Sequence, residues 1–319
     1  MKIKLWLKHL PWITVVTVCL FIPMYSQNPY TLHIAIMSCF YIIMAASLRL
    51  VFTMGLLNLA HATFGGIGAY TSALLVMRLG LPFWISFICA GLVAVLIAVV
   101  IGIPVLRLKG LYFIIITGVF AEVARLFWTW QVSIFGGING IMNIPPPDPF
   151  FGIAFTSKTS YFYLIYATMV ISLLIMNQLE KSRYGVTFHA ISQSDSLVES
   201  VGVNLMKHKI LCFATACFFA SVSGAFYAHY IQYINPQAWT IWQTILYQIM
   251  ATIGGVGSIV GSVIGGVFLT VLSEVLRAVK QYEPLVYSAL LILIIMFMPK
   301  GIISSPKRIS SLFWHQSGE

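Results

Sequence analysis

The residues most able to do chemistry are two pairs of opposite charges set within long apolar stretches. Glu122 lies three residues before Arg125, and Glu274 lies three residues before Arg277. On a helix this spacing places both members of a pair on one face, where each neutralises the other. A lone charge at the centre of a membrane helix costs about 2.5–3.5 kcal/mol, so it needs a partner or a water-filled cavity. The pairs predict either a pore or gate contact or a clamp between helices.

Other chemistries lack a matching pattern. The two aspartates, Asp148 and Asp195, lie in separate polar segments, which excludes an aspartyl pair within a membrane. No histidine pair has the spacing of a helical zinc site, and the sequence has neither a Gly-x-Ser-x-Gly motif nor a phosphate-binding loop. His61 and His229 lie in apolar runs, where hydrogen bonding within a bundle is the expected role. We predict no catalytic residue, metal site or cofactor, so any ATP hydrolysis comes from another chain.

The composition indicates that lipid is the solvent of most of the surface. Of the 319 residues, 60% are hydrophobic and 8% are charged, whereas a soluble domain carries roughly 25% charged residues. The sequence predicts an all-α, polytopic membrane bundle of about ten transmembrane helices in a single domain, residues 1–319. The link between the eighth and ninth helices is short, which leaves open a re-entrant or broken pair. The predicted spans are 11–25, 32–48, 55–77, 83–106, 111–130, 161–178, 210–233, 241–254, 259–279 and 285–298.

The basic residues predict the orientation of these spans. With the N-terminus in the cytoplasm, thirteen of the 18 lysines and arginines fall in inside segments, four fall outside, and Arg125 lies within a span. Cytoplasmic loops of membrane proteins carry an excess of Lys and Arg. We therefore expect a multi-pass protein of the cell inner membrane with both termini in the cytoplasm. The same bias explains the net charge of +10 without any nucleic acid.

Two long polar loops are candidates for contact with partners. The extracytoplasmic loop, residues 134–160, is rich in Gly and Pro, which stiffen a surface segment. A docking surface, a lid and a plain connector all remain open for it. The cytoplasmic loop, residues 180–209, is the longest polar stretch of the chain.

The cytoplasmic loop also contains an amphipathic pattern. Leu197, Val198, Val201 and Leu205 recur at intervals of three and four residues, which predicts a short amphipathic helix. A helix that binds lipid headgroups is rich in lysine on its polar face, and this one is not. The lack of lysine favours docking into the groove of a partner protein over lying on the lipid headgroups.

Several of these segments, in this order, resemble the branched-chain amino acid ABC transporter permeases of the LivM type. The resemblance runs from about residue 44 to residue 301, and its closing Pro299-Lys300-Gly301 is also similar. The other matching segments are 55–64 with 66–70, 108–113 with 120–122, 136–141 with 144–145, 223–229, and 254–258 with Gly261 and Gly265.

The resemblance implies a permease subunit that imports branched-chain amino acids or a similar small solute and is not itself an enzyme. It implies four partner chains, namely a second homologous permease, two cytoplasmic ATP-binding subunits and an extracytoplasmic solute-binding protein, besides membrane lipid. Urea and short-chain amide permeases look alike, so the solute stays open. The alternative is an ion-gradient-driven secondary transporter, which needs a titrating membrane carboxylate. Glu122 and Glu274 are the candidates, and the nearby arginines should keep both ionised.

The resemblance also implies roles for individual residues. In one departure, His189-Ala190-Ile191-Ser192 stands where the family has arginines around an Arg-Ala-Ile-Arg motif, which reduces the charge available to an ATPase. The implied coupling residues are Gly185, Ala190, Ile191, Asp195, Leu197, Glu199, Gly202, Val203, Asn204 and Lys209. Those expected at the pore or gate, or in helix packing, are Asn58, His61, Gly65, Gly68, Tyr70, Glu122, Arg125, Gly254, Gly255, Gly257, Glu274 and Arg277. Those expected to dock the binding protein are Gly137, Asn139, Gly140 and Pro145.

Overall fold

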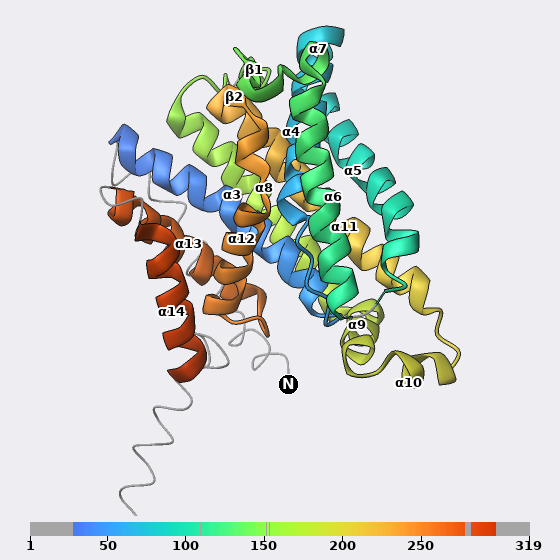
Figure 1. Cartoon of the computed structure of the whole chain (residues 1–319). Helices are drawn as coiled ribbons and strands as arrows, with labels where there is room; N and C mark the ends of the chain where they lie inside the picture. Colours follow the sequence, from blue (N-terminus) through green and yellow to red (C-terminus); the bar gives the residue numbers. More distant parts are fainter. Residues whose placement is uncertain (1–27, 109, 151, 153, 278–281, 298–319) are drawn as a thin grey trace, which may run out of the picture.

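The computed structural model is a bundle of obliquely crossing helices, which confirms the predicted all-α membrane fold (Figure 1). The structure describes residues 28–108, 110–150, 152, 154–277 and 282–297. The predicted span at residues 11–25 and the motif at residues 299–301 lie outside the described residues. The long helices are α3 (Pro29–Phe52), α4 (His61–Leu79), α5 (Phe83–Val105), α6 (Leu111–Trp130), α8 (Lys158–Lys181), α11 (Leu205–Ile231), α12 (Ile241–Gly254), α13 (Ile259–Val275) and α14 (Glu283–Phe297).

Shorter elements occupy the connections. They are α7 (Val132–Phe135), the 3-10 turn η1 (Gly137–Asn139), β1 (Ile141–Met142), α9 (Arg183–Gln193), α10 (Asp195–Ser200), β2 (Tyr233–Ile234) and the 3-10 turn η2 (Pro236–Trp239).

Local capping explains where several helices begin. The Asn28 side chain accepts a hydrogen bond from Tyr30 N at 3.0 Å at the start of α3, where Pro29 supplies a helical φ angle. The Asn204 side chain does the same for Lys207 N at 3.1 Å at the start of α11. Both helices therefore extend beyond the apolar runs from which they were predicted.

The number of spans stays a prediction. Within the described residues, α3, α5, α6, α8 and α11 are each long and apolar enough to cross a membrane, and the bent pair α12–α13 makes up to six. The prediction was wrong at the start of the third span. Residues 55–60 are not helical, and α4 begins only at His61. Periodicity had no means of finding this break, because the sequence is apolar on both sides of it.

The α12–α13 pair is sharply bent at its link, and both a broken span and a re-entrant pair, the two alternatives from the sequence, fit this bend. The two helices meet at an angle of 118° across residues 255–258. Gly255 has a φ of 113°, a conformation that residues with a side chain avoid. At 1.5 Å per residue the 14 residues of α12 reach about 21 Å, less than the roughly 30 Å of a bilayer core. The eighth predicted span is thus too short to cross a bilayer alone as a straight helix.

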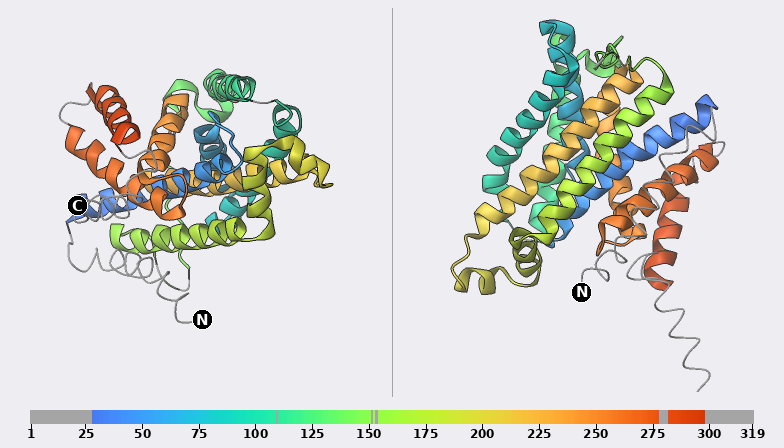
Figure 2. Two further views of the ribbon diagram at one scale, coloured as in Figure 1. Left: turned by 90° about the horizontal axis from the view of Figure 1, so that it is seen from below. Right: turned by 180° about the vertical axis from the view of Figure 1, so that it is seen from behind.

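The centre of the bundle is the crossing of α4 and α11, and the connecting elements lie at its two ends. The first half of α4 is buried throughout, and Gly65 and Gly68 face the backbone of α11 at Gly224 and Ser221. Helices α9 and α10 lie at one end of the bundle, whereas α7 and the two-stranded sheet lie at the other (Figures 1 and 2). The sheet pairs Ile141 with Ile234 in antiparallel register. The two long loops therefore reach opposite ends, as the predicted topology requires.

Candidate functional site

The predicted coupling segment folds as two short helices rather than one amphipathic helix. Helix α9 ends at Gln193, and the Ser194 side chain accepts from Leu197 N at the start of α10. Val198 is buried, whereas Leu197 and Val201 are 69% and 74% exposed. The sequence pattern had placed these residues on one face. The structure instead leaves two large apolar side chains in the open at the end of the bundle.

Polar contacts attach this segment to the bundle. Lys209 Nζ of α11 lies 2.9 Å from Asp195 Oδ2, and both side chains are largely shielded from solvent. Gly202 follows α10 with a φ of 81° and has open space around it, while Glu199 is exposed. Of the remaining predicted coupling residues, Gly185 and Ile191 are buried, Ala190 and Val203 are half-buried, and Asn204 caps α11.

The break before α4 brings buried polar groups together. The Asn58 side chain accepts from Ala60 N at 2.9 Å, and Thr244 Oγ1 of α12 accepts from Ala62 N at 3.0 Å. His61 Nε2 lies 2.8 Å from Ser47 Oγ of α3. These bonds satisfy backbone groups that a helix start leaves free, which is obligatory where water is absent. They also tie α4 to α3 and α12.

Two of three predicted packing glycines, Gly65 and Gly254, lie at close contacts. Gly65 packs on Trp239 of η2, and Gly254 packs on the carbonyl of Gly261. In contrast, a Cβ at Gly257 would meet no atom within 4 Å. Close packing thus needs the first two glycines but not the third.

The two predicted ion pairs form, in different surroundings. Arg125 binds both carboxylate oxygens of Glu122 within α6, and the Glu122 side chain remains 45% exposed near the middle of that helix. Glu274 accepts from Arg277 at 2.9 Å and also from Tyr30 Oη of α3 at 2.5 Å. The second pair therefore joins α13 to α3, whereas the first has no bond to another helix among the described residues.

The outer loop is fastened to α11 on the side opposite the coupling segment. His229 Nδ1 lies 2.6 Å from the Pro145 carbonyl, and its Nε2 lies 3.0 Å from Ser72 Oγ of α4. Gly140 has a φ of 69° and packs on the Ile234 carbonyl. Asn139 is exposed and Gly137 is buried, so the predicted docking residues do not share one open face.

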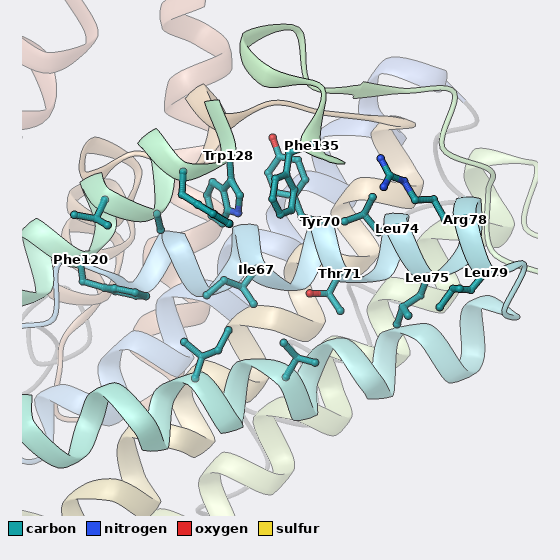
Figure 3. Close-up of a pocket in the computed structure, with 15 residues that line it drawn as sticks. Ile67, Tyr70, Thr71, Leu74, Leu75, Arg78, Leu79, Phe120, Trp128 and Phe135 are labelled. Atoms are coloured by element: carbon teal, nitrogen blue, oxygen red, sulfur yellow. The ribbon is translucent and has the colours of Figure 1, made fainter. Parts of the chain in front are cut away.

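A lateral groove runs between α4, α5 and α6. Its volume is about 690 Å³ and its lining is almost entirely apolar. Tyr70 lies against Trp128 and Phe135 in its wall, with ring centroids 4.9 and 5.3 Å apart (Figure 3). The Tyr70 hydroxyl has no hydrogen-bond partner among the described residues. Arg78 lines the groove and donates to the Ser133 and Ile134 carbonyls.

Comparison with known proteins decides the class of this molecule. Residues 30–299 match the family model described as branched-chain amino acid transport system / permease component. The chain belongs to this family. It is a multi-pass inner-membrane permease subunit of an ABC importer, and such subunits are not themselves enzymes.

Curated relatives of this permease carry related names. It is 30% identical over 296 residues to the high-affinity branched-chain amino acid transport system permease protein LivM of Salmonella typhimurium, covering 86% of this chain and 70% of the relative. It is 29% identical to LivM of Escherichia coli over the same shares of both chains. It is 25% identical to LivH of Salmonella typhimurium, covering 80% and 87%. No solved structure gives a significant match.

Sequence reasoning missed one buried ion pair in this permease. Arg49, near the end of α3, bonds to Glu180, near the end of α8, although 131 residues separate them. The only available signal was a charged residue at the end of each of two apolar runs, and Arg49 had been counted merely as one of the inside positive charges. Buried charges of this kind need a partner.

Proposed function

We propose that this permease imports branched-chain amino acids, assembled with a second permease, two cytoplasmic ATP-binding subunits and an extracytoplasmic solute-binding protein. The observation that carries the proposal is the family match over residues 30–299. The names of its relatives supply the solute. The polytopic domain would supply the passage, and the partner chains would supply energy and solute.

The coupling role of residues 180–209 is supported by their exposed apolar side chains. Helix α10, which carries Leu197 and ends one residue before Val201, lies at the end of the bundle that the predicted topology puts in the cytoplasm (Figure 1). Isolated apolar side chains on a surface are common, but here Leu197 of α10 and Val201 directly after α10 occur in the same segment as the exposed Tyr184 and Val186 of α9. An ATP-binding subunit that receives these side chains in a groove would transmit its movement to the bundle.

Pairing with a second permease is supported by Glu122. Its carboxylate is partly exposed near the middle of α6, where contact with lipid would be costly. We infer that the second permease, or solvent in the passage between the two permeases, covers this face of α6. The outward faces of α5, with exposed Leu92, Leu96 and Val100, suit membrane lipid instead.

Reconstitution tests the proposal directly. The complex is purified from native membranes, its chains are identified, and ATP hydrolysis is measured in proteoliposomes with leucine, isoleucine, valine, urea or acetamide. The proposal predicts two ATP-binding subunits, a second permease, and hydrolysis that only the branched-chain amino acids stimulate through the binding protein. If only urea or acetamide stimulates ATP hydrolysis, the transported solute is that amide and not a branched-chain amino acid. Uptake that survives ATP depletion but collapses with an uncoupler would contradict the energy source.

A further inference from the structure

Arg49 joins three parts of the chain that are far apart in sequence. Its side chain is 1% exposed, at the end of α3. Nη1 donates to the Val256 carbonyl at 2.8 Å and to Glu180 Oε1 at 3.2 Å, and Nη2 pairs with Glu180 Oε2. Glu180 lies one residue before the end of α8, and Val256 lies in the bend between α12 and α13. The Arg49 guanidinium therefore connects the end of α8, where the coupling segment begins, to the bend between α12 and α13.

On the coupling side, Glu180 lies against α9. Gly185 lies so close to the Glu180 carbonyl that a Cβ there would overlap it. His189 Nε2 of α9 lies 3.8 Å from Glu180 Oε1. The end of α9 reaches the link between α3 and α4, because a Cβ at Gly55 would lie 3.4 Å from Ser192. A displacement of α9 would thus move the carboxylate that Arg49 holds.

On the other side, the bend is built to move as one piece. Backbone packs directly on backbone between α12 and α13, at Gly254 against Gly261 and at Gly265 against the Met250 carbonyl. Such contacts leave little room for the two helices to slide independently. The Val256 carbonyl lies in the bend that joins α12 to α13. A displacement of this carbonyl would therefore move both helices.

The chemistry of the link favours arginine. A planar guanidinium can donate to both oxygens of a carboxylate and to a carbonyl at the same time, with fixed geometry, which an ammonium cannot reproduce. We propose that Arg49 is a positioning residue that carries movement of the coupling segment to the α12–α13 bend during transport. This inference rests on the proposed function, since it assumes that partner ATPases act on α9 and α10.

The test separates transmission from mere folding by removing both charges at once. Replacing a buried ion pair with apolar residues is often neutral for stability, whereas removing one partner leaves an uncompensated charge. The full importer is therefore reconstituted with Arg49→Gln, Glu180→Gln or the double variant Arg49→Met/Glu180→Met. Arg107→Gln, an exposed arginine near the end of α5, is the matched control.

We expect the double variant to assemble and to hydrolyse ATP in response to loaded binding protein, as the wild type does. Solute moved per ATP should fall at least about tenfold, within the usual range of coupling between sites, while Arg107→Gln keeps the wild-type ratio. A wild-type ratio in the double variant would overturn the role of Arg49 alone. A wild-type complex without solute-stimulated hydrolysis would overturn the proposed function and this inference together.

A distance measurement gives a readout that a purely structural role would not change. Spin labels on Gln193→Cys, at the end of α9, and Gly257→Cys, where there is room for a side chain, report the separation of the coupling segment and the bend. With Arg49 present, we expect one narrow distance in both the resting and the ATP-trapped complex. In the double variant that distance should broaden on ATP trapping. A distance that stays narrow in the double variant would contradict the link.

Discussion

Gly68 of α4 packs directly on the backbone of Ser221 in α11, with no side chain between the two helices. A Cβ at position 68 would overlap the Ser221 carbonyl oxygen. We predict that Gly68→Val forces the helices apart and destabilises the permease by about 1–3 kcal/mol, the usual cost of overpacking. The measurement is the midpoint of thermal unfolding in detergent. Gly257→Ala, where a Cβ meets nothing, is the control, and equal midpoints for the two variants would contradict the packing role.

The ion pair between Lys209 and Asp195 should hold α10 against the bundle. Because both side chains are largely shielded, Lys209→Met removes the positive charge that neutralises the Asp195 carboxylate, at a cost of about 3–5 kcal/mol. We expect faster proteolysis within residues 180–209 of this variant. The double variant Lys209→Met/Asp195→Leu should recover most of the protection. Equal cleavage rates in the single variant and the wild type would show that the pair does not hold the segment.

The two arginines of the predicted ion pairs should differ in their importance for assembly. Arg125→Gln leaves Glu122 charged and uncompensated near the middle of α6, which costs about 2.5–3.5 kcal/mol on insertion scales. Arg277→Gln removes an arginine that is mostly exposed, and Glu274 keeps its bond to Tyr30. We expect the second permease to copurify poorly with the first variant and normally with the second. Equal copurification would argue that Glu122 does not face the partner.

The exposed Leu197 of α10 and Val201 directly after α10 should matter for ATPase binding and not for membrane insertion. Leu197→Asp and Val201→Asp each place a charge where we expect a partner groove, and buried anchors often contribute 2 kcal/mol or more to binding. We predict at least about tenfold weaker retention of the ATP-binding subunits. Ser196→Asp, which adds the same charge on the same exposed helix, should retain them. If all three variants behave alike, charge rather than apolar contact governs the interaction.

The sequence alone predicts most helices because residues that interrupt an apolar run, such as glycine, mark the helix ends. The predicted bounds of α6 and α12 agree with the structure at both ends, where Gly110 and Gly255 interrupt the apolar text. The break before α4 contains Gly55 and Asn58, but the leucines between and after them are as apolar as those of a helix, so the sequence does not place the start of α4 at His61. That start depends instead on tertiary hydrogen bonds, such as the one from Ala62 N to Thr244.

The candidate site likewise contains contacts that the sequence predicts and contacts that it does not. Local pairs three residues apart, such as Glu122 with Arg125, follow from helix geometry and were predicted. The partner of Arg49 lies on another helix, and no local pattern selects Glu180 among the acidic residues of the cytoplasmic loop. The division of the coupling segment into α9 and α10 was also missed. Ser194 caps α10, but serine alone is too common to mark a helix start.

The most direct test is the side from which Leu197 can be labelled. A Leu197→Cys variant is treated with a membrane-impermeant thiol reagent in right-side-out and inside-out vesicles, with and without the ATP-binding subunits. If α10 is the cytoplasmic receptor of an ATPase, labelling occurs only in inside-out vesicles and slows strongly when those subunits are bound. Labelling from the outside, or a rate that the subunits leave unchanged, would contradict the proposal that this permease is driven through α9 and α10.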